Sequence, residues 1–342
     1  MNNIIRAARW IARRSPGRTC GTGRRRHHLQ TVVGIDEAGY SPLLGPLVIT
    51  AACFEVRTTH KNWWAALGIP TARGNPRLPA LPAVDDSKKL YAPNRGVGKL
   101  EEGVLAFLKA AGRHPASLRQ LLACVGCEAD TEGYPWYREA DVAIPVAAGP
   151  EAIDPAAAEL GRAFERSGVR FTGFRSAPLL AGDFNTKVQA RGNKSLVLFH
   201  SAMRLVDGFI VPGKPLQVLA DKQGARNYYA QLLSQYFFGC RLQRVVEGKE
   251  LSTYRISHGG RRLDISFCLK GDSAHLPIAL ASMCSKYIRE LFMVLFNRYW
   301  NSVKPGMGRT SGYQVDGRRF IRGISALPQF AEIPRNLIIR QK

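Results

Sequence analysis

Residues 31–39 read Thr31-Val32-Val33-Gly34-Ile35-Asp36-Glu37-Ala38-Gly39, a short β-branched apolar run that ends in a carboxylate doublet. This composition and length predict a buried strand over residues 31–36. Neighbouring residues of a regular strand face opposite sides of the sheet. Asp36 and Glu37 can therefore point the same way only if the strand ends at Asp36 and the turn at Gly39 brings Glu37 round.

Two further apolar runs are followed by an acidic residue: Leu216-Gln217-Val218-Leu219-Ala220-Asp221 and Ile265-Ser266-Phe267-Cys268-Leu269-Lys270-Gly271-Asp272. Taken alone, an aspartate at a strand end is more often a turn or helix cap than a ligand. Buried carboxylates are costly, however, and four of them brought together would repel one another unless they held divalent cations. If Asp36, Glu37, Asp221 and Asp272 converge at the strand ends, they would suit two Mg²⁺ or Mn²⁺ ions about 4 Å apart, an arrangement that can hydrolyse a phosphodiester.

The overall charge indicates a polyanionic partner. The chain of 342 residues has a formal net charge of +23, which favours nucleic acid first and an anionic membrane surface second. Residues 1–30 hold eight Arg and no Asp or Glu, about a third of that excess. The remainder is still basic, so nucleic acid is the expected partner.

Cysteine usage and hydropathy bear on location. The seven cysteines show no regular spacing, which indicates reduced thiols and a cytoplasmic protein. No apolar run reaches about 18 residues, so we expect no membrane partner, and we expect a monomer. The Arg-rich residues 1–30 have three interpretations: an organelle address, a nucleic-acid-binding arm, or an upstream start without structural meaning. We favour a disordered basic tail.

Periodicity predicts a mixed α/β layer architecture with one main domain over residues 31–325. Within it we expect a surface insertion over 124–182, which is rich in Ala, Pro and Gly, and extra strands over about 241–262. Residues 326–342 are expected to form a C-terminal tail. The helices expected are 98–110, 154–166, 193–206, 227–238 and 276–299, and the strands are 31–36, 47–56, 216–220, 241–246, 252–256 and 263–269.

Several motifs resemble those of the type 2 ribonucleases H, the ribonuclease HII family. The opening motif is Gly34-Ile35-Asp36-Glu37-Ala38-Gly39 with Gly45-Pro46-Leu47-Val48, and the next is Asp86-Ser87-Lys88-Lys89-Leu90. The third is Lys270-Gly271-Asp272-Ser273 followed by Ala281-Ser282-Met283, and Gly312-Tyr313 resembles a pair near the family's C-terminal end. These motifs stand in the family's order but cover only about a third of residues 31–320.

The resemblance implies a ribonuclease H-like α/β fold with a mixed five-stranded sheet flanked by helices. It also implies that the four carboxylates are the metal ligands, and that the chain is an endoribonuclease cutting the RNA strand of RNA–DNA hybrids to leave 5′-phosphate ends. The substrate-binding positions implied in the same way are Gly39, Tyr40, Ser41, Ser87, Lys88, Lys89, Lys286 and Tyr313.

The chain departs from the family in the loop after the carboxylate doublet. Where the family has Gly-Arg-Gly, this sequence has Gly39-Tyr40-Ser41. Tyr40 removes a bidentate phosphate donor, and Ser41 adds a side chain where the backbone would approach closely. We therefore interpret the chain as a divergent branch with altered substrate choice, and the cutting of single embedded ribonucleotides stays an open alternative.

Two other functions compete with this interpretation. One is a non-catalytic nucleic-acid-binding protein on a ribonuclease H-like scaffold, which the altered loop favours and the four carboxylates disfavour. The other is a related nuclease that acts on DNA. A basic stretch interleaved with Tyr228, Tyr229 and Tyr254 suits either a nucleic-acid surface or a solvated strand face; its cations are Arg226, Arg241, Arg244, Lys249, Arg255, Arg261 and Arg262.

Overall fold

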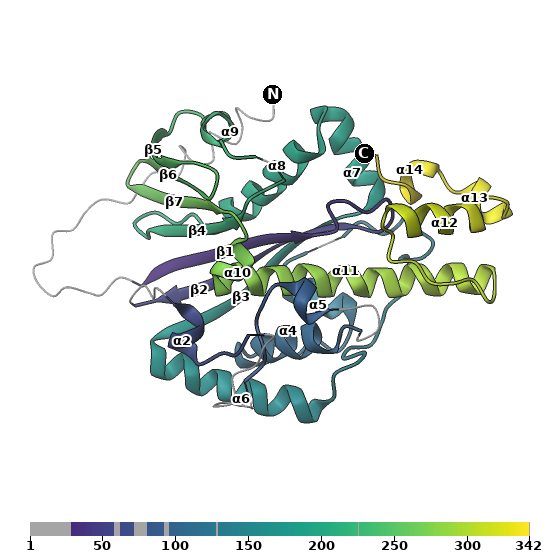
Figure 1. The fold of residues 1–342 in the computed structure, drawn as a ribbon, viewed down its shortest axis with the longest axis horizontal. Helices are drawn as coiled ribbons and strands as arrows, with labels where there is room; N and C mark the ends of the chain where they lie inside the picture. Colours follow the sequence, from purple (N-terminus) through teal and green to yellow (C-terminus); the bar gives the residue numbers. More distant parts are fainter. Residues whose placement is uncertain are drawn as a thin grey trace, which may run out of the picture.

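A mixed seven-stranded sheet organises the computed structural model, which describes residues 29–57, 62–71, 81–91, 96–127, 129–224 and 226–341 (Figure 1). The strand order is β3-β2-β1-β4-β7-β6-β5. β1 is parallel to β4, and β4 to β7, whereas the remaining pairs are antiparallel. The strands are β1 Gln30–Ala38, β2 Leu47–Val56, β3 Val169–Leu179, β4 Leu216–Asp221, β5 Arg241–Glu247, β6 Leu251–His258 and β7 Arg261–Cys268.

The expected fold class is confirmed. Strands β3, β2, β1, β4 and β7 form a five-stranded mixed unit, and the β5–β6 hairpin extends it by two strands. The helices are α2 Trp63–Leu67, α3 Ser87–Leu90, α4 Gly98–Ala110, α5 Leu118–Cys124, α6 Pro150–Ser167, α7 Ala181–Arg191, α8 Lys194–Asp207, α9 Ala230–Tyr236, α10 Gly271–Ala274, α11 Leu276–Val303, α12 Gln314–Ile324, α13 Pro328–Glu332 and α14 Arg335–Ile338.

The helices form two layers, one on each face of the sheet, and each layer packs against the sheet through its own apolar core. Helices α11, α4 and α6 lie on one face, and α7, α8 and α9 lie on the other (Figure 1). Helix α11 packs so closely on β1 that a Cβ atom at Gly34 would stand 2.1 Å from the carbonyl carbon of Pro277. This contact explains why glycine interrupts an otherwise β-branched strand.

Residues 124–182 are not the surface insertion that the sequence predicted. β3 pairs with β2 along its whole length, so the second part of this region is a strand of the main sheet. Helix α6 buries Ile153, Ala156 and Leu160 in the core that it shares with α4. The apolar residues of β3 and α6 therefore form part of the core rather than an addition to its surface.

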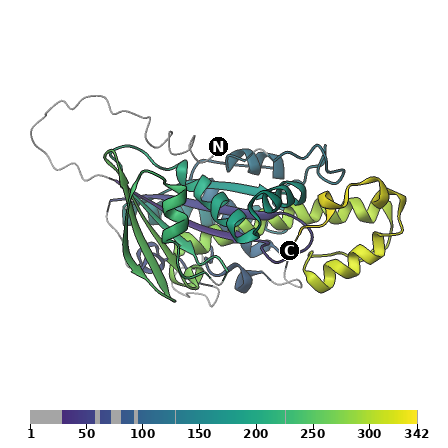
Figure 2. The same cartoon turned by 90° about the horizontal axis from the view of Figure 1, so that it is seen from above.

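The expected C-terminal tail is also corrected. Helices α13 and α14 bury Phe330 and Ile338, and Arg340 is only 3% exposed. Figure 2 shows α12, α13 and α14 at one end of the molecule and β5, β6 and β7 at the other. The basic tail expected over residues 1–30 falls almost entirely outside the described residues.

The β5–β6 hairpin confirms the extra strands expected near 241–262. Tyr254 is fully buried on the face that α9 covers, and Tyr229 is buried beside it. Arg255 and Arg262 both pair with Asp264, at 2.8 and 2.7 Å. This distribution favours the solvated strand face over an aromatic nucleic-acid surface for these residues.

No helix in the described ranges combines the length and the apolar character needed to cross a membrane.

Candidate metal centre and nucleic-acid interface

Two of the predicted metal ligands lie side by side at the carboxyl ends of parallel strands. Ile35 of β1 is in register with Ala220 of β4, and the next residue on each strand is Asp36 or Asp221. β1 continues in regular pairing with β2 through Glu37. The strand thus does not end at Asp36, and the side chain of Glu37 leaves on the opposite face of the sheet.

Asp272 reaches the same edge from a short helix rather than from a strand. β7 ends at Cys268, and Asp272 lies in α10, which follows it. The backbone N–H of Gly271 donates to Oδ1 of Asp221 at 2.7 Å. This hydrogen bond ties the start of α10 to the end of β4 and places Asp272 beside Asp221.

Burial and mutual repulsion raise the pKa of all four carboxyl groups. Burial is the largest cause for Asp36, and the charges of Glu37 and Asp221 raise its pKa further. Burial and then Asp221 raise the pKa of Glu37 to about 8. Burial also raises the pKa of Asp221 above its ordinary value, and burial and neighbouring aspartates raise that of Asp272 to about 6. Asp221 is therefore the carboxylate whose charge reaches each of the other three.

Helix α3 supplies a cation that acts on three of these carboxyl groups. The positive charge of Lys88 opposes the rise in the pKa of Glu37, Asp221 and Asp272. Its backbone N–H donates at 2.9 Å to Oδ1 of Asp86, the residue that caps α3. Lys88 is thus placed beside the carboxylates by a local turn.

The neighbours of Lys88 in this motif have separate roles. Ser87 is buried, and its hydroxyl accepts a hydrogen bond from Ser282 of α11 at 3.0 Å. Lys89 pairs with Asp85 at 2.7 Å, and of the four carboxylates only Asp272 acts on its pKa. Of the predicted substrate-binding residues in α3, Lys88 therefore lies nearest to the carboxylates.

The carboxylates are close enough to interact electrostatically but not close enough for shared coordination. Among the residues that the structure describes, no three or more His, Cys, Asp or Glu side chains are grouped so that they could hold a metal ion. Coulombic coupling extends over several ångströms, whereas Mg²⁺–oxygen bonds measure about 2.1 Å. Binding a shared ion would therefore require rotation of these side chains.

The loop that follows Asp36 and Glu37 packs against α11. Gly39 has a φ of +88°, and a Cβ atom there would lie 2.5 Å from the carbonyl oxygen of Pro46 and 2.7 Å from Nε of Arg289. Only glycine fits both the conformation and the space. Tyr40 is half-buried, and Ser41 is exposed with its carbonyl accepting from Nε2 of Gln314 at 3.0 Å.

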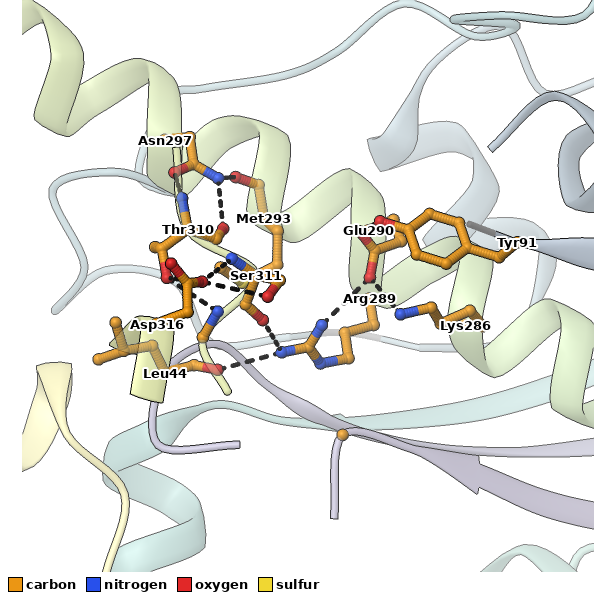
Figure 3. Close-up of polar contacts among 12 residues, drawn as sticks. Leu44, Tyr91, Lys286, Arg289, Glu290, Met293, Asn297, Thr310, Ser311 and Asp316 are labelled. Carbon is orange, nitrogen blue, oxygen red and sulfur yellow. Dashed lines mark hydrogen bonds and ion pairs between the residues drawn. The ribbon is translucent and has the colours of Figure 1, made fainter. Parts of the chain in front are cut away.

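Arg289 is the buried support of this loop (Figure 3). Its side chain is fully buried, and its guanidinium donates to the carbonyl oxygens of Leu44 at 3.3 Å and Ser311 at 2.7 Å. It also pairs with Glu290 at 3.1 Å. Arg289 thus joins the loop of residues 39–46 to the segment that leads into α12.

Glu290 connects that support to the predicted substrate-binding residues (Figure 3). Its carboxylate accepts from Lys286 at 2.7 Å and from the hydroxyl of Tyr91 at 3.1 Å. The ammonium of Lys286 lies 4.2 Å from the ring centre of Tyr91 and 5.9 Å from that of Tyr313. Tyr313 is 44% exposed. The structure therefore places the buried ammonium of Lys286 beneath the exposed ring of Tyr313.

Three residues near the site had not been predicted to belong to it. Asp86 raises the pKa of Asp221 and Asp272, although the sequence showed it only as the first residue of a motif. Tyr91 had no signal beyond its position one residue after that motif. Arg340 donates to the carbonyl oxygens of Gly39 and of Tyr40, the latter at 3.2 Å, from a segment with no recognisable pattern.

Comparisons with known proteins gave only distant structural similarities. No protein-family model and no curated protein matches the sequence. A structure of the PCNA:RNase HII complex from Archaeoglobus fulgidus is similar at 14% identity and a TM-score of 0.43, over 91% of this chain and 94% of that chain. The ribonuclease H2 of Pyrococcus horikoshii OT3 is 16% identical, with a TM-score of 0.44, over 91% and 92%.

A structure of Bst-RNase HIII in complex with Mn²⁺ is 16% identical, with a TM-score of 0.40, over 98% of this chain and 76% of that chain. With identities and TM-scores this low, function has to be inferred from the residues of the site.

The raised pKa of Glu37 predicts a pH dependence of stability in EDTA. Between its ordinary pKa of 4.5 and the raised pKa of about 8, the folded protein binds more protons than the unfolded chain. The free energy of unfolding should therefore fall as the pH rises through this range. Glu37→Gln should flatten the fall, as measured by urea denaturation at several pH values. If the free energy of unfolding falls with the same slope in Glu37→Gln as in the parent, Glu37 is not the source of the pH dependence. Glu102→Gln is the matched control and should keep the slope of the parent.

Proposed function

We propose that this chain is a metal-dependent endonuclease that hydrolyses the RNA strand of RNA–DNA hybrids and leaves 5′-phosphate and 3′-hydroxyl ends. One observation carries the proposal: four carboxyl groups with raised pKa gather at one edge of the sheet in a chain with a net charge of +23. Such repulsion is unfavourable for folding, so a role in binding cations accounts for it.

The donor chemistry of this edge fits Mg²⁺ or Mn²⁺. All four groups offer carboxylate oxygens, the ligands that these hard cations prefer. The residues that would hold the ions are Asp36, Asp221 and Asp272, joined by Glu37 from the opposite face of β1, once their side chains have rotated toward a shared ion. When bound, such ions lower the pKa of an attacking water and stabilise the leaving oxygen of a phosphodiester.

The protein's own contribution is to orient these carboxylates. Asp36 is held against α11, where the Ser285 hydroxyl donates to its backbone carbonyl at 3.1 Å and Ser282 hydrogen-bonds its side chain. Asp221 is fixed by the N–H of Gly271. Lys88 supplies positive charge where a backbone phosphate would approach. The other end of the substrate would meet Tyr313, whose exposed ring can pack on a sugar.

The proposed substrate rests on the resemblance of the motifs to the ribonuclease HII family together with this placement. The carboxylates, Lys88 and the Tyr313 ring all lie along α11 or the strand ends that it supports. This arrangement suits a duplex that lies across the edge of the sheet. The altered loop at Tyr40 and Ser41 is the feature expected to change which ribonucleotide-containing duplexes are cut.

Three labelled substrates test the proposal: an RNA–DNA hybrid, a DNA duplex with one ribonucleotide, and an all-DNA duplex. With Mg²⁺ or Mn²⁺ we expect cleavage of the RNA strand of the hybrid and no cleavage in EDTA. Cleavage of the single-ribonucleotide duplex would assign junction recognition to the altered loop. Cleavage of the all-DNA duplex alone would favour the DNA nuclease instead, and binding without any metal-dependent cleavage would favour the non-catalytic binding protein.

A further inference from the structure

Tyr40 interacts electrostatically with Glu37 and with two arginines. Burial raises the pKa of its phenol, and the negative charge of Glu37 raises it further, whereas Arg226 and Arg340 act in the opposite direction. Arg340 is buried, and its guanidinium donates hydrogen bonds to the carbonyl oxygens of Gly39 and Tyr40. Arg226 lies nearer to solvent, so its charge is accessible beside Tyr40.

A second accessible cation approaches Tyr40 from α8. The ammonium of Lys194, the first residue of that helix, lies 4.8 Å from the centre of the Tyr40 ring. The next residue, Ser195, accepts a hydrogen bond from Nη2 of Arg226 at 3.1 Å. This bond fixes the guanidinium next to the start of α8, so that both cations belong to one small region. The amino end of the 14-residue helix adds further positive potential there.

These two cations lack the carboxylate partners that many other basic residues of the protein have. Both are half-buried, yet neither forms an ion pair within the described part of the chain. Partial burial weakens hydration and makes an unpaired charge costly. Arg226 also retains further N–H donors in a planar fork, a geometry that matches the oxygens of a phosphate.

We propose that Lys194 and Arg226 form a phosphate-binding subsite beside Tyr40, which holds a backbone phosphate of the bound nucleic acid next to the one at the carboxylates. The inference deepens the proposed function and rests on it for the identity of the ligand. The subsite lies next to the face of β1 on which Glu37 leaves the sheet. A strand that reaches the carboxylates past Glu37 therefore meets Tyr40 and these two cations directly.

The test measures binding without cleavage, using the full chain in EDTA. Affinity for a labelled RNA–DNA hybrid and for an all-DNA duplex is followed by fluorescence anisotropy over a series of salt concentrations. Lys194→Ala combined with Arg226→Ala should weaken binding by about tenfold and reduce the salt slope by about 1, the value for one lost phosphate contact.

Matched variants separate this effect from a general loss of positive charge. Arg204→Ala combined with Lys214→Ala removes two exposed charges away from the subsite and should leave the slope close to that of the parent. Arg226→Lys, which keeps the charge, should recover much of the affinity. Equal affinities and slopes for the two double variants would overturn the proposal, provided that both melt like the parent.

Two further results keep this test distinct from that of the proposed function. The slope is measured without metal, so a chain that shows the Lys194–Arg226 effect but never cuts RNA retains the subsite and loses the nuclease assignment. If the chain cuts the hybrid but these substitutions have no effect on binding, the nuclease assignment stands and the phosphate-binding subsite is ruled out. If inorganic phosphate stabilises the parent but not the double variant while hybrid binding is unchanged, free phosphate is the ligand and the proposal fails.

Discussion

Asp36→Asn should reduce hybrid cleavage by about a thousandfold or more, because it removes one negative charge from the centre of the proposed metal site. The substitution keeps the size of a side chain that is only 7% exposed, so the fold should be retained. Binding of the hybrid should stay unchanged or become tighter, since a charge that repels phosphate is lost. Single-turnover cleavage and anisotropy binding measure the two effects separately.

The same substitution carries an internal check on stability. Burial and neighbouring charges raise the pKa of Asp36, so its ionised form is unfavourable in the folded protein without metal. Asp36→Asn should therefore be at least as stable as the parent in EDTA at neutral pH. Asp154→Asn, at an exposed ion pair with Lys109, is the control for charge removal. Cleavage within tenfold of the parent by Asp36→Asn would show that the site is wrongly assigned.

Glu101→Ala should cause the largest loss of stability, about 3–5 kcal/mol in the free energy of unfolding. Glu101 is fully buried on α4, and its carboxylate accepts four hydrogen bonds at 2.6–2.7 Å. The donors are the backbone N–H groups of Val146, Ala147 and Ala148 and the hydroxyl of Tyr287. Alanine would leave the buried hydroxyl of Tyr287 and three partly buried backbone N–H groups without this acceptor.

Urea denaturation at constant pH measures this loss directly. Glu102→Ala on the same helix is the matched control, because Glu102 pairs with the exposed Lys99 and the loss of this ion pair should cost less than about 1 kcal/mol. If the two variants unfold at the same urea concentration, the buried carboxylate does not hold the 146–148 segment to the core. Cleavage activity should follow the folded fraction, because Glu101 lies outside the proposed site.

Local patterns predicted the elements that have strong periodicity of their own. The helix over residues 98–110 was predicted with the bounds of α4. The helix expected over 193–206 is α8, which Asn193 caps by accepting a hydrogen bond from the N–H of Ser195 at 2.7 Å. β3 was missed because its sequence sits in a region rich in Ala, Pro and Gly. Its identity as a strand is fixed by pairing with β2, a contact over more than 100 residues.

In the site, too, local sequence patterns predicted some features, and long-range contacts determined the others. The register of β1 and β4 sets Asp36 beside Asp221, which the acidic ends of two apolar runs had indicated. The direction of Glu37 depended on where β1 ends, and pairing with β2 decided it. Arg340 could not be predicted because its partners are carbonyl oxygens some 300 residues away, which carry no side-chain signature. The metal-binding role of the carboxylates stays a prediction.

Helix α11 also fixes the distance between the two ends of the proposed site. It touches Asp36 through Ser282 and Ser285, and eight residues after Ser282 it presents Glu290, which anchors Lys286 near Tyr313. At 1.5 Å per residue these points are roughly 12 Å apart, a span of three to four nucleotides at about 3.4 Å each. The spacing between the carboxylates and the sugar contact that we propose for Tyr313 is therefore set by helix geometry, and a kink in α11 would misalign the two ends without altering either one.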